Sequence, residues 1–308
     1  MTATLPGLKT VTIEQARGIC ADLARSHYEN FTVVSAFFPK AKRQDMFNVY
    51  AFCRYSDDLG DEELGQGDRV EALDQWDVEV DRMFAGEPRH PILVALAETC
   101  ARYRIPAKPL HDLVAAFRMD QTRPRWATFD DVLFYCRHSA NPVGRLVLYV
   151  FEEARDETFA LSDETCTGLQ LANFWQDVRP DLLERDRIYI PQDSLARAGV
   201  TEEEVRAWAV ASALPAERAE AWRALMKLEV DRARGYFDRG FGLLPLVRRD
   251  LRIDLELFGR GGTAILDAIE RQRYDVFRKR PRISKGKKAW LVLKALLKLK
   301  LSGIARGS

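Results

Sequence analysis

The sequence predicts an all-α protein, and three of its features lead to that fold class. Apolar residues recur at helical spacing along most of the chain, whereas the alternation typical of strands is scarce. Glycine and proline mark the joins between these helical stretches. With 308 residues and 47% hydrophobic content, the chain can enclose a sizeable core. No repeat or Pro/Gly/Ser-rich linker divides it, so we predict one helical domain over residues 1–284 and a basic amphipathic tail over 285–308.

Caps and helix breakers place the individual helices. Thr12 is a candidate N-cap for the first of them, IEQARGICADLARSHY. Ser162 or Asp163 is expected to open a strong helix that Pro180 ends or bends. After the first helix, the predicted helices cover residues 41–59, 69–85, 90–103, 107–120, 129–154, 163–181, 201–211, 215–239, 242–256 and 260–280.

Two groups of helix-breaking residues lie near the predicted helices. The stretch HSANPVGRL, 138–146, puts Asn141, Pro142 and Gly144 inside the helix at 129–154. Such residues break or kink a helix, so this stretch is either a loop between two helices or a kink that borders a pocket. The glycines within 259–262 are expected to separate the last two helices.

Charge and cysteine usage restrict the function classes and the location. Lys plus Arg (47) nearly cancel Asp plus Glu (46), which gives no global electrostatic case for nucleic-acid binding. The five cysteines include no C-x-x-C pair and are typical of a reduced compartment. The N-terminus lacks the apolar core of a secretory signal, and no run of about 18 apolar residues predicts a transmembrane helix. A cytoplasmic protein is therefore expected.

Two polar stretches carry carboxylates four residues apart. They are AFCRYSDDLGDE (51–62), with Asp57 and Asp61, and QLANFWQDVRPD (170–181), with Asp177 and Asp181. In a helix this spacing places both side chains on one face. Asn173 extends the second stripe by one more turn. Like charges at this spacing destabilise a helix, so the pattern requires either a solvated surface or a bound cation.

Oxygen ligands of this kind suit Mg²⁺, with Mn²⁺ as an alternative, because both metals prefer carboxylates, amides and waters. Mg²⁺ also takes phosphate oxygens, so we predict that metals hold a diphosphate between the two stripes. The plainer interpretation is that both stripes are solvated helix faces. A carboxylate-bridged di-iron bundle would need Glu-x-x-His motifs, and none of the four histidines follows a Glu at that spacing.

These motifs resemble the squalene/phytoene synthase family over roughly residues 20–280. The matching segments are YAFCRYSDDLGDE (50–62), YCRHSANPVG (135–144), QLANFWQDVRPD (170–181) and RIYIP (187–191). The resemblance implies an isoprenoid-synthase helical bundle around a central cavity. It also implies Mg²⁺-dependent ionisation of a prenyl diphosphate.

The resemblance carries functional roles onto particular residues of this chain. It implies that metal is bound by Asp57, Asp61, Asn173, Asp177 and Asp181, and that Tyr189 joins the four aspartates in the catalytic set. It places around the substrate Tyr50, Arg54, Gln170, Tyr274, Asn30 and Arg137. Asn30 replaces a usual serine, Arg137 a usual tyrosine, and Gln176 a usual arginine. Because these positions hold diphosphates, the differences weaken the case for condensing two substrates.

One branch of the family resembles this chain most. ENFTVVS, YCRHSANPVGRLVL and NFWQDVRPDLLERDRIYIP are similar to the hydroxysqualene synthases of bacterial hopanoid biosynthesis. That branch takes presqualene diphosphate from a sister synthase, releases diphosphate and captures the rearranged cation with water, without NADPH. We expect the water near Arg137, His138 and Asn141. The expected aromatic lining of the cavity is Phe31, Phe37, Tyr50, Phe52 and Trp175.

Two other functions stay open. The chain could be a head-to-head condensing synthase that makes presqualene diphosphate, squalene or phytoene, or a non-catalytic prenyl-lipid-binding partner at the membrane. The tail KGKKAWLVLKALLKLKL, 285–301, is basic and apolar. It suits either peripheral contact with the inner face of the cytoplasmic membrane or packing on the domain.

Overall fold

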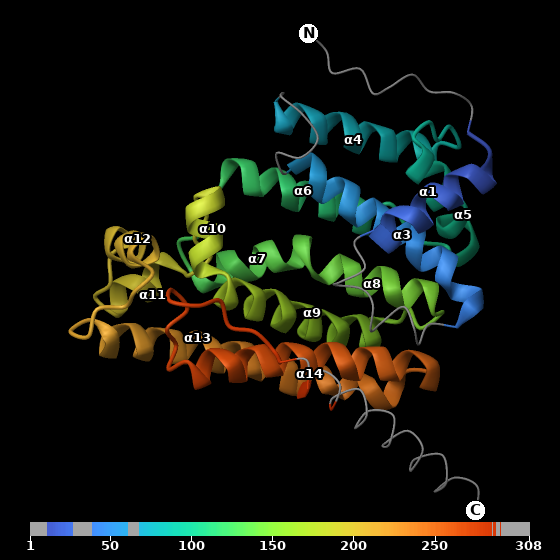
Figure 1. Ribbon diagram of the computed structural model, residues 1–308. Helices are drawn as coiled ribbons and strands as arrows, with labels where there is room; N and C mark the ends of the chain where they lie inside the picture. Colours follow the sequence, from blue (N-terminus) through green and yellow to red (C-terminus); the bar gives the residue numbers. More distant parts are fainter. Residues whose placement is uncertain (1–10, 27–38, 61–67, 285, 288–289, 291–308) are drawn as a thin grey trace, which may run out of the picture. The chain divides into compact units, whose positions relative to one another are not determined.

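The computed structural model describes residues 11–26, 39–60, 68–284, 286–287 and 290. Over this part of the chain the regular structure is helical (Figure 1). The described residues form no strand, and a single isolated β-bridge joins Arg125 and Ile188. The all-α prediction is therefore confirmed.

The helices fall into two compact units along the chain. The first unit comprises Met1–Thr122 and Asn141–Phe159, and the second comprises Arg123–Ala140 and Ala160–Ser308. In chain order the elements are α1 (Ile13–Ser26), α3 (Lys40–Gly60), α4 (Arg69–Phe84), α5 (Pro91–Tyr103), α6 (Lys108–Thr122), α7 (Phe129–Ser139), α8 (Asn141–Val150), α9 (Asp156–Gln176), α10 (Val178–Arg185), α11 (Gln192–Arg197), α12 (Glu202–Ala211), α13 (Ala219–Gly240), the 3₁₀ helix η2 (Phe241–Leu246) and α14 (Arg249–Arg271).

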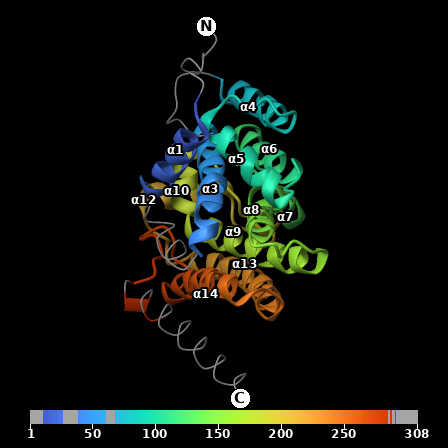
Figure 2. The same cartoon turned by 90° about the vertical axis from the view of Figure 1, so that its right-hand side faces the viewer.

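In the first unit, α1, α3 and α5 pack against one another (Figure 2). The predicted cap of α1 is present: the Gln15 amide N–H donates to Thr12 Oγ1 (3.3 Å), and Thr12 N–H donates to Gln15 Oε1 (2.9 Å). Phe52 of α3 and Leu96 of α5 are fully buried. The packing holds α3 in place along its length, and α3 carries the first acidic motif.

In the second unit, α13 and α14 pack side by side, and small residues allow α9 to approach them. A Cβ on Gly262 of α14 would collide with Phe237 of α13 and meet Leu169 of α9 at 3.0 Å. The predicted join at 259–262 is therefore wrong, because α14 runs through these glycines. Close helix packing, not a chain break, explains Gly262.

Other boundaries differ from the prediction in informative ways. Helix α9 begins at Asp156, so neither Ser162 nor Asp163 opens it. The predicted helix at 129–154 divides at Ala140 into α7 and α8, with no long loop between them. Pro180 does bend the second motif. Pro180 has no N–H to donate to the Gln176 carbonyl, and the helix is interrupted at Asp177, directly after Gln176.

The described helices include none that is long and apolar enough to cross a membrane, as expected. The proposed tail, 285–308, lies mostly outside the described residues, and its role remains a prediction.

Candidate active site

The first acidic motif occupies one face of α3. Tyr50, Arg54 and Asp57 follow at intervals of four and three residues, so they lie on successive turns of one stripe. The Asp57 side chain is 44% exposed, whereas that of its neighbour Asp58 is 13% exposed. Asp61 would continue the stripe but lies outside the described residues. The face that carries Asp57 is therefore open to a ligand.

The opposite face of α3 is anchored by hydrogen bonds. Trp76 Nε1 donates to Ser56 Oγ (2.9 Å), and Ser56 Oγ donates to the Phe52 carbonyl (2.7 Å). At the C-terminal end, Gln121 Nε2 donates to the Gly60 carbonyl (2.8 Å). These bonds join α3 to α4 and α6 on the side opposite the acidic stripe.

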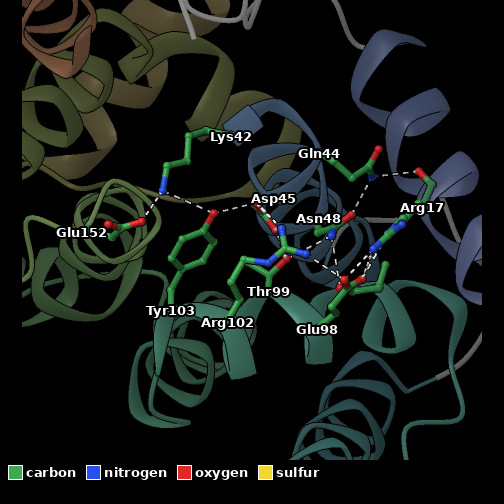
Figure 3. Close-up of polar contacts among 11 residues, drawn as sticks. Arg17, Lys42, Gln44, Asp45, Asn48, Glu98, Thr99, Arg102, Tyr103 and Glu152 are labelled. Atoms are coloured by element: carbon green, nitrogen blue, oxygen red, sulfur yellow. Dashed lines mark hydrogen bonds and ion pairs between the residues drawn. The ribbon is translucent and has the colours of Figure 1, made fainter. Parts of the chain in front are cut away.

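A buried polar network anchors the N-terminal half of α3 (Figure 3). Asp45 is 2% exposed and accepts hydrogen bonds from Thr99 (3.0 Å), Arg102 (3.0 Å) and Tyr103 (2.9 Å) of α5. Lys42 Nζ bonds Glu152 at 2.6 Å. Each charge in this group has an opposite partner, so the network holds helices together and leaves no net charge for a ligand.

Arg54 neutralises part of the first motif from within its own helix. Its guanidinium lies 3.6 Å from an Asp57 oxygen and also pairs with Asp58. Both contacts arise from the i,i+3 and i,i+4 geometry of the helix. Tyr50, one turn earlier, has its phenol pKa raised, mainly by burial. The motif thus combines a cation, an exposed carboxylate and a half-buried phenol.

The second acidic motif crosses the bend between α9 and α10. Asp177 N–H donates to the Asn173 carbonyl and Asp181 N–H to the Asp177 carbonyl, both at 2.9 Å. These bonds keep Asn173, Asp177 and Asp181 on successive turns across the interruption. Gln170 lies one turn before Asn173 on the same stripe. The predicted second stripe is therefore present.

Arg280 holds the carboxylate of Asp177. Its Nη2 donates to Asp177 Oδ2 (2.8 Å), and its Nε pairs with Asp177 Oδ1. The same Nη2 lies 3.3 Å from Gln176 Oε1, while Gln176 Nε2 donates to the Pro281 carbonyl at 2.5 Å. Sequence analysis missed Arg280, because 103 residues separate it from Asp177. The only available cue was the basic run RKRPR at 278–282.

Tyr189 belongs to an aromatic cluster beside the second motif. Its ring stacks on Phe174 of α9 with centroids 3.8 Å apart and planes 7° apart. Tyr135 lies 5.6 Å from Tyr189 and 5.9 Å from Phe174. Phe174 is three residues before Asp177, so the ring contact places Tyr189 against α9, the helix that carries Asn173.

Three other predicted site residues remain, namely Arg137, Tyr274 and Asn30. Arg137 is exposed on α7, with its guanidinium 5.5 Å from the Phe134 ring. Tyr274 follows α14, and its pKa is raised, mainly by burial. Asn30 lies outside the described residues.

Three further residues expected at the site have defined contacts in the structure. Phe52 and Trp175 are fully buried, and their role as cavity lining stays a prediction. Phe52 stacks on Trp76, and Trp175 Nε1 donates to the Glu229 carbonyl (3.1 Å). His138 lies on α7 with Nδ1 2.9 Å from the Phe134 carbonyl oxygen.

The second motif offers donor groups that fit a magnesium ion. Two carboxylates and one amide lie on successive turns, and Mg²⁺ usually completes its octahedron with water and phosphate oxygens. Among the described residues, no three His, Cys, Asp or Glu side chains form a metal cluster by themselves. The first motif belongs to the other compact unit, so a site shared by both motifs remains a prediction.

Comparison with known proteins gives consistent matches. The family model for squalene/phytoene synthase matches residues 24–287. A phytoene synthase from Arthrospira platensis is 33% identical over 300 residues, which are 92% of each protein. The 15-cis-phytoene synthase of Synechococcus elongatus is 30% identical and covers 95% of this chain and 96% of its own.

Solved structures share the fold. A squalene synthase, HpnC, from Alicyclobacillus acidocaldarius is 45% identical, with a TM-score of 0.79 over 85% of this chain and 95% of that one. A dehydrosqualene synthase in complex with ligand has a TM-score of 0.81 at 23% identity, covering 94% of this chain and 98% of its own. The predicted isoprenoid-synthase fold is thereby confirmed.

Proposed function

This chain belongs to the squalene/phytoene synthase family, and on that premise we propose that it is a hydroxysqualene synthase. The reaction breaks the carbon–oxygen bond of presqualene diphosphate and releases diphosphate. Water adds to the rearranged cation and gives up a proton, which yields hydroxysqualene. Electrons balance without NADPH, because no carbon is reduced. The observation that carries the proposal is the stripe of Asn173, Asp177 and Asp181 on successive turns.

The proposed roles follow from the donor atoms of each motif. Asp57 and Asp61, and separately Asn173, Asp177 and Asp181, would hold the metal; when bound, Mg²⁺ supplies the charge that stabilises the departing diphosphate. Arg54 would exchange its partners on α3 for diphosphate oxygens, a geometry that a guanidinium fork suits.

Aromatic and amide side chains would stabilise the carbocation and orient the hydrocarbon part of the substrate. The stacked pair Tyr189 and Phe174 presents π-electrons beside the motif, and such faces stabilise carbocations. Gln170 and Tyr50, each on a polar stripe, would orient the substrate. Arg137, in the last turn of α7, remains our candidate for placing the water.

Relatives and departures from the family pattern support this branch. The 45% identity to a squalene synthase exceeds the 33% identity to a phytoene synthase. Asn30, Arg137 and Gln176 replace groups that the family pattern uses to hold diphosphates. An enzyme that takes one diphosphate substrate needs fewer such groups than one that takes two.

The alternative is head-to-head condensation of two prenyl diphosphates, which would make the chain a prenyltransferase. It is favoured by the phytoene synthases among the relatives at 30–33% identity. A non-catalytic lipid-binding partner is the weaker alternative, because Asp177 and Asp181 are both retained on their stripe.

Product analysis by mass spectrometry tests the proposal. The purified protein with Mg²⁺ and no NADPH is incubated with presqualene diphosphate in one tube and with farnesyl diphosphate in another. We expect hydroxysqualene from the first tube and no product from the second. A condensation product in the second tube would instead make the chain a condensing synthase.

We also propose that this protein is cytoplasmic and receives its hydrophobic substrate from a presqualene diphosphate synthase at the membrane surface. The basic, apolar sequence of 285–301 supports contact with anionic lipid. Co-sedimentation with vesicles containing phosphatidylglycerol should fall when Lys294 and Lys298 are both changed to Glu. Unchanged binding would exclude the tail as the contact.

A further inference from the structure

The Asp177 side chain does not cap the helix that it opens. It occupies the N-cap position of α10, where an aspartate normally accepts a bond from the first turn, yet its side chain makes no capping bond. The carboxylate is instead turned to Arg280, which bonds both of its oxygens. A group that is not needed for the helix is available for exchange between partners.

Arg280 covers this carboxylate from the solvent side. The Arg280 side chain is 42% exposed, whereas that of Asp177 is 11% exposed. Asp181 adds to the negative potential around the guanidinium, and the pKa of Arg280 is raised chiefly by its bond to Asp177. The two Asp177 oxygens that Arg280 bonds are the atoms that a metal cation would also bind.

A second hydrogen bond joins the same two segments, and here the donor lies on the acidic motif. The buried Gln176 side chain donates to the carbonyl of Pro281, the residue after Arg280. Two adjacent residues of the motif thus hold two adjacent residues of the C-terminal segment. Arg278, Arg280 and Arg282 of the same basic run are all exposed, and of these three described residues Arg280 is the one that bonds the Asp177 carboxylate.

We infer that Arg280 is a latch on the second acidic motif. In the metal-free protein Arg280 neutralises Asp177, and when a metal ion binds, the ion displaces Arg280 from that carboxylate. The inference rests on the proposed function, because it assumes that Asp177 binds metal. A guanidinium and a divalent cation repel each other and cannot share both oxygens of one carboxylate. Once displaced, Arg280 is free to pair with the diphosphate that arrives with the metal.

This arrangement predicts opposite effects of Arg280 on two ligands. It opposes a metal ion alone, because the ion must break the latch. It favours diphosphate in the presence of metal, because the released guanidinium gains a phosphate partner. A merely structural role would change both affinities in the same direction, so the reversal of sign identifies the latch.

The test measures binding to the full-length protein without turnover. Mn²⁺ affinity is measured by electron paramagnetic resonance for wild type, Arg280→Gln and the control Arg282→Gln, which removes an equal charge from an exposed neighbour. We expect Arg280→Gln to bind Mn²⁺ about tenfold more tightly, the change expected when one charge-assisted bond no longer competes. It should bind inorganic diphosphate with Mn²⁺ more weakly, and Arg282→Gln should match wild type.

The outcomes separate the latch from the proposed function. Equal or weaker Mn²⁺ binding by a folded Arg280→Gln, with wild-type binding intact, overturns the latch and leaves the proposed metal site standing. Absence of Mn²⁺ binding to the wild-type protein overturns both the latch and the proposed metal site. In an Asp177→Asn background, Arg280→Gln should have no further effect on Mn²⁺ affinity; a persistent tenfold gain there contradicts the latch.

Discussion

An arginine neutralises aspartate charge in each of the two acidic motifs, but the arginine comes from a different part of the chain in each case. On α3, Arg54 lies three and four residues before Asp57 and Asp58 and neutralises them within one helix. At the α9–α10 bend, Asp177 is neutralised by Arg280 from 103 residues further along the chain. The first arrangement forms whenever α3 forms, whereas the second requires the unit around α9, α13 and α14 to be packed.

The difference has a functional meaning. A local arginine stays within reach of its carboxylates, because the helix fixes their spacing. A remote arginine can leave, because it belongs to another segment. We therefore propose that Arg54 stays beside the first motif whether it pairs with carboxylates or with diphosphate, whereas a metal ion replaces Arg280 at the second motif.

The largest expected effect comes from removing a carboxylate from either motif. Asp57→Asn and Asp177→Asn should each lower kcat/KM for presqualene diphosphate by about 10³-fold, because each loses a charged metal ligand. Steady-state kinetics and circular dichroism measure activity and fold together. Glu184→Gln, an exposed change on α10, is the matched control. Near-normal activity in Asp57→Asn would remove the first motif from the site.

The next effect tests the local arginine. Arg54→Gln should reduce kcat/KM by about 10²-fold, since it removes one charge-assisted contact to the leaving group. The exposed Lys40→Gln, at the start of α3, should behave as wild type. If instead Arg54→Gln lowers only the melting temperature, Arg54 serves the helix and not the substrate.

A third test uses a buried acid in the second unit. Asp254 on α14 is fully buried, and neither of its carboxylate oxygens has a hydrogen-bond partner among the residues that the structure describes. Burial, with help from Asp250, raises the pKa of Asp254 to about 8. The folded protein therefore keeps a proton that the unfolded chain releases above about pH 4, so this group costs stability as pH rises toward 8.

Asp254→Asn should remove that cost. Its advantage in the free energy of unfolding should be near zero at low pH and grow to about 4 kcal/mol near neutral pH, because each pH unit between the two pKa values adds about 1.4 kcal/mol. Urea unfolding from pH 5 to 8 measures the slope, with Asp250→Asn as the comparison. A pH-independent difference between Asp254→Asn and wild type would show that Asp254 is ionised in the folded protein.

The smallest expected effects compare the anchors behind each motif. Trp76→Phe removes the indole bond to Ser56 behind α3, and Trp175→Phe removes the indole bond to the Glu229 carbonyl behind α9. Each change should cost about 1 kcal/mol in the free energy of unfolding. Thermal unfolding measures both. A much larger activity loss in one variant would show that its anchor also sets the direction of the acidic stripe.

Local pattern was enough to predict the second stripe and most helices. The spacing in 170–181 placed Asp177 and Asp181, and Thr12 marked the start of α1. The first stripe is described only as far as Asp57, so its second carboxylate, Asp61, stays a prediction. Long-range packing was not predictable in this way. Gly262 was read as a break because its contact with Phe237 comes from another helix, and Arg280 was missed because its partner is distant in sequence.

The most direct test of the proposed hydroxysqualene synthase activity follows the oxygen atom. The protein is given presqualene diphosphate and Mg²⁺ in water enriched in heavy oxygen, and both products are analysed by mass spectrometry. Capture of the cation by water predicts heavy oxygen in the alcohol and none in the released diphosphate. Label in the diphosphate, or an alcohol without label, would contradict carbon–oxygen cleavage followed by water capture.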